Sequence, residues 1–170
     1  MFFFNKRKHQ KAIIDDFYNQ TKSNVIALQR ILYNHGAAPF IENNKDRFYS
    51  YSFFFLSYCQ DVALISKYGK KYNSLATEIV PSLIVRFSER MNYIPQKMSD
   101  IYLTIRNQLA EAAFDENVKK IGLYYGVACH YIIAALPKEY DPDSTDVYFE
   151  LATFFQSRIN KNIEYLSTIT

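Results

Sequence analysis

Apolar residues recur along most of this chain at alternating steps of three and four positions. That spacing places side chains on one face of an α-helix. The first such series runs through Ile14, Tyr18, Thr21, Val25, Leu28 and Leu32. Similar series predict helices over about 8–34, 44–69, 74–92, 99–114, 116–136 and 147–167. With six helices and no convincing strand, we predict an all-α, single-domain bundle of about six helices.

The segment 47–58, RFYSYSFFFLSY, carries seven aromatic rings in twelve positions. Aromatic residues favour strands, but residues 53–56 are continuously apolar, and the helical spacing continues to residue 65. We therefore predict a ring-rich second helix, central in the bundle, with apolar surface on more than one side. Because a tyrosine hydroxyl usually seeks a polar partner, Tyr49, Tyr51 and Tyr58 are candidates for a partner interface or a pocket rim. Membership of the core is the alternative.

Glycine and proline mark the expected helix ends. Gly36 stands where a left-handed residue terminates a helix, and the second helix is expected to stop at Gly69. Pro81 lies inside the third series, so the helix either kinks there or a new helix begins with it. Ser99 or Asp100 is the expected N-cap of the fourth helix.

Composition fits one packed domain. The chain has 170 residues, of which 49% are hydrophobic, with four glycines and five prolines. We expect residues 12–170 to form the helical domain, preceded by an arm over 1–11. The apolar start is followed by basic residues, the reverse of a secretory signal, so a cytoplasmic location is expected. In that compartment the two cysteines, Cys59 and Cys129, are predicted to be free. The net charge of +3 is too small to indicate nucleic acid.

The N-terminal arm has the most unusual composition. Its aromatic and basic residues precede the first acid: Phe2, Phe3, Phe4, Lys6, Arg7, Lys8 and Lys11. Inserted rings together with several cations are a recognised means of attachment to an anionic membrane surface. The arm therefore predicts peripheral contact with the inner face of a membrane. The simpler alternative is that the rings fold back onto the bundle.

An acidic stretch precedes the last helix. Residues 139–150 hold five acids and no base, among them Asp141, Asp143, Asp146 and Glu150. The stretch fails as a calcium loop, because it lacks the required glycine and the terminal glutamate. Asp143 or Ser144 is instead the expected N-cap of the sixth helix. The acids also form a candidate docking surface for a basic protein, with a solvated loop as the alternative.

Gly122 and Gly126 lie four residues apart inside the fifth predicted helix. Glycines at this spacing share a helix face and allow another backbone to approach closely. The pair predicts a tight helix crossing, within the chain or in a homodimer.

Catalytic and metal-binding patterns are weak. The three histidines, His9, His35 and His130, lie far apart, and none has the cysteine or glutamate spacing of a metal site. No catalytic residue, metal ligand or cofactor site is therefore predicted. If a site is assembled from distant helices, the polar side chains to inspect first are Arg86, Glu89, Arg106, Glu111 and His130.

The leading hypothesis is a non-enzymatic cytoplasmic module that binds another protein through an aromatic or acidic helical surface. Inhibitors, immunity-type antidotes, adaptors and chaperones work in this way. One alternative is a small-molecule-binding bundle with a Phe/Tyr-lined pocket between the second, third and fifth helices. Another is a peripheral membrane protein held by the N-terminal arm.

Overall fold

The computed structural model describes residues 2–69, 73–112, 122–142 and 144–169. Within these ranges it contains seven helices and no strand, which confirms the predicted all-α bundle. The helices are α1 (Phe2–Asn34), α2 (Ala38–Asn43), α3 (Lys45–Tyr68), α4 (Asn73–Met91), α5 (Pro95–Ala112), α7 (Leu123–Ala135) and α8 (Asp146–Thr168). The missed helix, α2, spans only six residues.

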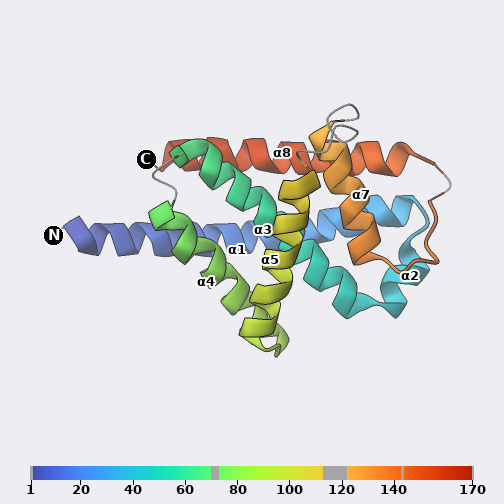
Figure 1. Cartoon of the computed structure of the whole chain (residues 1–170), viewed down its shortest axis with the longest axis horizontal. Coiled ribbons are helices and arrows are strands. Elements are labelled where there is room, and N and C mark those ends of the chain that lie inside the picture. Colours follow the sequence, from blue (N-terminus) through green and yellow to red (C-terminus); the bar gives the residue numbers. More distant parts are fainter. Residues whose placement is uncertain (1, 70–72, 113–121, 143, 170) are drawn as a thin grey trace.

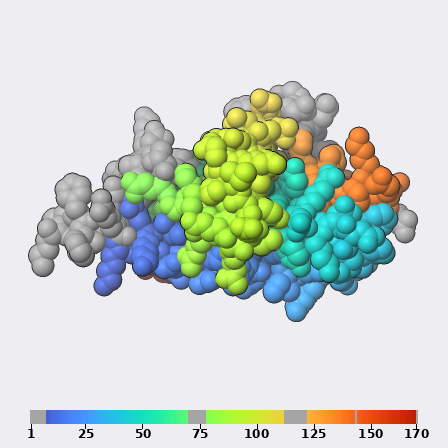
Figure 2. All heavy atoms as spheres, turned by 90° about the horizontal axis from the view of Figure 1, so that it is seen from below, coloured from blue at the N-terminus to red at the C-terminus, as the bar shows by residue number. Residues whose placement is uncertain are grey.

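The bundle is organised around α3. In Figure 1 the long helices α1 and α8 run in opposite directions, so that α1 begins at the end of the molecule where α8 finishes. Helix α3 crosses them obliquely and packs against each of the other helices in the described part of the chain. Helices α4 and α5 form a hairpin on one side, and Figure 2 shows this hairpin standing out over α1. The prediction of a central ring-rich helix is confirmed.

Three consecutive phenylalanines explain the position of α3. Phe53 stacks on Phe87 of α4, with 4.1 Å between ring centroids. The ring of Phe54 lies 6.3 Å from that of Tyr102 in α5, and the ring of Phe55 lies 5.2 Å from that of Tyr131 in α7. Successive helix residues point about 100° apart, so three adjacent buried rings require packing partners on three sides.

Two buried polar side chains on α3, Gln60 and Ser52, form hydrogen bonds with neighbouring helices. The Gln60 side-chain amide donates to the Phe17 carbonyl and to the Thr21 hydroxyl, each at 2.9 Å. The hydroxyls of Ser52 and Tyr131 are 2.7 Å apart and share a hydrogen bond. Because a buried polar group without a partner costs free energy, these contacts favour one packing of α3 against α1 and α7.

The glycine-terminated helices agree with the sequence prediction. Gly36 has φ 78° and donates to the Tyr33 carbonyl, while Ala37 donates to the Leu32 carbonyl. This pair of bonds is the Schellman arrangement that closes the C-terminus of α1. Gly69 also has a positive φ, 51°, and follows the last residue of α3.

Two prolines occupy different positions in their helices: Pro81 lies inside α4, and Pro95 is the first residue of α5. Helix α4 continues through Pro81, so the alternative that a new helix begins at this residue is wrong. Helix α5 begins at Pro95, whereas Ser99 or Asp100 was the predicted cap. Proline suits the first helical position, because its fixed φ is helical and the amide proton it lacks would have no partner there.

Helix α1 begins at Phe2, six residues before the predicted start near Lys8. The backbone of the predicted N-terminal arm is therefore the first part of this helix. Lys8 and Lys11 are exposed, whereas the side chains of residues 2–7 lie outside the described part. Among the described residues, no helix combines the length and apolar content that crossing a bilayer requires.

The central position of α3 makes its rings the main determinant of stability. We predict that Phe54→Ala lowers the free energy of unfolding by about 3–5 kcal/mol, because the ring is fully buried among other rings. Urea denaturation followed by circular dichroism measures the change. Phe149→Ala is the matched control: that ring is 59% exposed, and its loss should cost less than about 1 kcal/mol. Equal losses would contradict the central role of Phe54.

Candidate functional site

The three candidate tyrosines of α3 are half-buried and reach different parts of the molecule. Tyr49 lines a pocket with α1 and α4, and Tyr51 lines a cavity with α5 and α7. Tyr58 lies near the Asp61 carboxylate, and burial raises the pKa of its hydroxyl to about 12. The three side chains therefore do not belong to one continuous surface. All three pack against the hydrophobic core, and Tyr49 and Tyr51 also line pockets. Their part in a partner interface stays a prediction.

The acidic residues before and within α8 lie close in sequence to an aromatic cluster with one exposed ring and two half-buried rings. Asp141, Asp146 and Glu150 are exposed, and Asp143 lies outside the described residues. The ring of Phe149 is 59% exposed and lies 5.0 Å from the ring of Tyr125 in α7.

We call the surface formed by Tyr125, Tyr148, Phe149, Asp146 and Glu150 the α7–α8 patch. Tyr125 also contacts Tyr148, at 5.7 Å between ring centroids, so the three rings form a continuous aromatic surface. Glu150 has a partner within the chain, because its carboxylate lies 2.9 Å from the His35 imidazole. Asp146 takes part in no ion pair among the described residues.

The start of α8 differs in detail from the prediction. Thr145 occupies the N-cap position and makes no side-chain capping bond. The Ser144 hydroxyl instead accepts a hydrogen bond from the Asp146 amide at 3.0 Å. Asp146 lies in the first helical turn, where a negative charge is favoured by the helix dipole. These contacts place the acids at the exposed start of α8.

Gly122 does not lie inside a helix, so this part of the prediction is wrong. It immediately precedes α7 and has φ 94°, a conformation that residues with a side chain rarely adopt. Gly126 lies in the first turn of α7 and donates to the Gly122 carbonyl at 3.2 Å. The two glycines therefore lie at the N-terminal end of α7 and do not share a face inside one helix. A homodimer remains a prediction.

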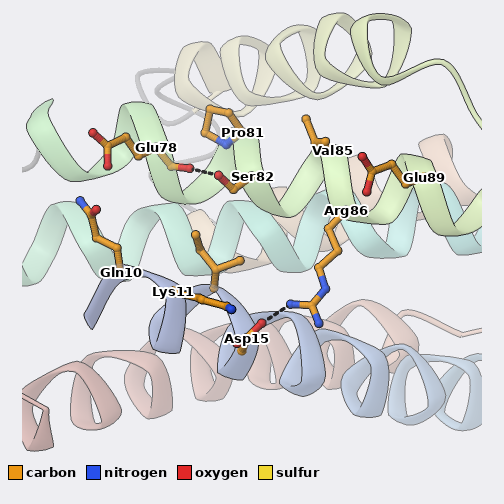
Figure 3. Close-up of a pocket in the computed structure, with 10 residues that line it drawn as sticks. Gln10, Lys11, Asp15, Glu78, Pro81, Ser82, Val85, Arg86 and Glu89 are labelled. Atoms are coloured by element: carbon orange, nitrogen blue, oxygen red, sulfur yellow. Dashed lines mark hydrogen bonds and ion pairs between the residues drawn. The ribbon is translucent and has the colours of Figure 1, made fainter. Parts of the chain in front are cut away.

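A wide groove separates α1 from α4 (Figure 3), with a volume of about 1020 Å³. Gln10, Lys11 and Asp15 line it from α1, while Glu78 and Glu89 line it from α4. Arg86 reaches across from α4 and pairs with Asp15, as Figure 3 shows. The amide nitrogen of Gln10 is buried and has no hydrogen-bond partner in the described part of the chain. The groove therefore presents charges of both signs.

Two smaller cavities adjoin α3. One, of about 390 Å³, lies between α3, α5 and α7, and its lining includes Tyr51, Thr104 and His130. At one end of it, Arg47 donates to the carbonyls of Ile133 and Ala134 near the C-terminus of α7. The other, of about 280 Å³, lies between α1, α3 and α4. The sequence predicted a ring-lined pocket between the helices now labelled α3, α4 and α7, a different combination.

A buried ion pair joins α3 to α5. The Asp61 side chain is 3% exposed and accepts a 2.6 Å hydrogen bond from Arg106, which is 37% exposed. Burial raises the pKa of the Asp61 carboxyl above 3.8, although Arg106 acts in the opposite direction. The Tyr102 pKa is also well above 10.0, through its burial and the nearby carboxylate. The pair connects two helices and lines none of the three cavities described above.

The other polar candidates are dispersed. Arg86 and Glu89 line the α1–α4 groove, and His130 lines the α3–α5–α7 cavity. Glu111 is exposed near the end of α5. Both cysteines are free, and burial raises the pKa of the Cys59 thiol to about 12, which disfavours the reactive thiolate. Within the described ranges, no three His, Cys, Asp or Glu side chains gather as a metal site would require.

Comparisons of this chain with protein-family models, with curated proteins and with solved structures each found no match. The side chains that the fold leaves exposed are therefore the available guide to function. Sequence reasoning identified the acids of the α7–α8 patch but missed Phe149. The sequence signal that could have identified Phe149 is its position among polar residues on one face of α8.

The buried carboxyl of Asp61 predicts a specific pH dependence. Its pKa is higher in the folded chain than in the unfolded chain, so the folded state retains the proton to a higher pH. As pH rises from about 3.8 through the folded pKa, wild type should lose stability relative to Asp61→Asn. Urea denaturation of both proteins at a series of pH values measures this difference.

Arg106→Gln provides the matched comparison. It removes the positive charge that lowers the folded pKa of Asp61, so the upper end of the pH interval over which stability is lost should move upward, while its lower end stays at the unfolded pKa. If the difference between wild type and Asp61→Asn does not vary with pH, the assignment of a raised Asp61 pKa is wrong.

Proposed function

We propose that this protein binds another protein that has a basic surface, and that the α7–α8 patch is the binding site. The observation that carries the proposal is the position of Phe149. In a chain whose other phenylalanines of α8 and α3 are buried or half-buried, this ring is 59% exposed and lies against Tyr125. Aromatic side chains with acids around them have the composition of an interface centre with a charged rim.

The aromatic cluster is suited to provide the affinity. Phe149 is already held against Tyr125, so less side-chain freedom is lost when a partner covers it. Covering a large apolar side chain contributes about 1.5–3 kcal/mol when burial is complete, and here about half of the ring starts exposed. One ring is insufficient for a stable complex, so Tyr125 and Tyr148 must be covered as well.

The acids are suited to provide selectivity. Asp141 and Asp146 are exposed, and the segment 139–150 contains no lysine or arginine. Opposite charge on the partner speeds association and excludes acidic competitors, and salt screens this attraction. A basic partner is therefore favoured over an acidic one.

We predict that the substitution Phe149→Ala weakens binding of the protein partner. Affinity purification from the native host should recover one protein in stoichiometric amount with wild type, and at least about tenfold less with Phe149→Ala. Ile94→Ala is the matched control, since Ile94 is 68% exposed but lies between α4 and α5. Its partner recovery should equal that of wild type.

A second variant tests the charges. Asp146→Asn combined with Glu150→Gln should weaken the same complex and reduce its dependence on salt, while thermal denaturation confirms that the fold is retained. Equal recovery by Phe149→Ala and wild type would contradict the assignment of the site. Turnover of a metabolite by the isolated protein, with no stoichiometric partner, would contradict the proposed function.

A further inference from the structure

The cavity of about 280 Å³ between α1, α3 and α4 is lined mainly by apolar side chains. The stacked rings of Phe53 and Phe87 belong to its lining, together with Tyr18 and Val25 of α1. Ile26 also lines it and is 53% exposed, which places this residue where the cavity meets solvent. In Figure 2, α1, α3 and the α4–α5 hairpin adjoin on one face of the molecule.

All charged residues in the lining of this cavity are basic. Lys22 contributes from α1 and Arg90 from α4, and both are exposed. Neither makes a hydrogen bond or an ion pair with any residue in the described ranges. Arg86, the next cation along α4, differs in this respect: it pairs with Asp15 and its guanidinium lies 4.5 Å from the centre of the Tyr18 ring.

We propose that this cavity binds a small anionic amphiphile, a molecule with an apolar body and a single carboxylate. The body contacts Phe53, Phe87 and Val25, and the carboxylate stays at the opening between Lys22 and Arg90. An arginine guanidinium suits this role, because its paired donors match the two oxygens of a carboxylate. This site is separate from the α7–α8 patch and does not depend on the proposed protein-binding function.

The volume limits the size of the body. At about 30 Å³ for each water-sized group, the cavity holds roughly nine such groups. A phenyl ring with a short alkyl chain has this size, whereas a long-chain lipid does not fit. The geometry therefore favours an aryl-alkyl or short acyl carboxylate.

The test uses 4-phenylbutyrate as the probe and 4-phenylbutanol as its neutral counterpart. Isothermal titration calorimetry on the full chain should show saturable binding of the carboxylate, with the alcohol at least about tenfold weaker. Arg90→Gln and Lys22→Gln should each reduce the preference for the carboxylate. Phe149→Ala should leave the affinity unchanged, which keeps this result independent of the proposed function.

Ile26 gives a matched pair of variants at the opening. Ile26→Glu places a negative charge beside the carboxylate and should weaken 4-phenylbutyrate about tenfold, while Ile26→Gln should have a much smaller effect. Ile94→Glu introduces the same charge at another exposed isoleucine and should change nothing. Because Ile26 is half-exposed, these variants are expected to fold, and circular dichroism verifies it.

Three results would overturn the proposal. The first is equal affinity for the carboxylate and the alcohol. The second is unchanged binding by Ile26→Glu. The third is no binding of either probe by the folded protein, combined with a protein partner that wild type captures and Ile26→Glu does not. That last outcome would assign the cavity to a side chain of a protein partner.

Discussion

The packing of aromatic rings on several sides of α3 is the constraint on which the rest of this structure depends. Three adjacent phenylalanines, Phe53, Phe54 and Phe55, contact rings in α4, α5 and α7. A helix with one apolar stripe packs on one side and leaves the other in water. A helix with buried rings in three directions has to be enclosed, and α1 and α8 complete the enclosure (Figure 1).

This constraint also bears on the two surfaces that the proposals use. Most of the aromatic side chains pack inside the bundle. The exposed ring of Phe149 is therefore not needed to fill the core. The cavity between α1, α3 and α4 adjoins the stacked pair Phe53 and Phe87, where three helices meet. Both proposed sites are thus consequences of the same arrangement.

The sequence predicted the features that depend on local periodicity. The long helices and their glycine ends could be recognised because a stripe of three or four turns repeats often enough to be distinct from chance. Helix α2 was missed because six residues make fewer than two turns and show no period, and Pro39 within it suggested a break. The start of α5 was misplaced for a related reason, since Pro95 fits the first turn of a helix as well as a loop.

The features that depend on distant residues could not be predicted. Nothing near Asp61 in the sequence indicates that Arg106, on another helix, is its partner. Likewise, the periodicity of α3 shows that Tyr49 and Tyr51 point to different sides but not which cavity each one lines. Such facts are set by how the helices cross, and helix crossings depend on many side chains at once.

The distribution of charge distinguishes the two proposed sites more sharply than the net charge does. A total of +3 suggests little about partners. Yet the α7–α8 patch has acids beside its exposed ring, while the α1–α3–α4 cavity has only Lys22 and Arg90 as charged lining. Helices α7 and α8 contribute no residue to the lining of that cavity. We therefore propose two separate sites on one small bundle, an acidic and aromatic surface for a basic protein and a basic-rimmed cavity for a small carboxylate, each of which a different set of mutations should remove.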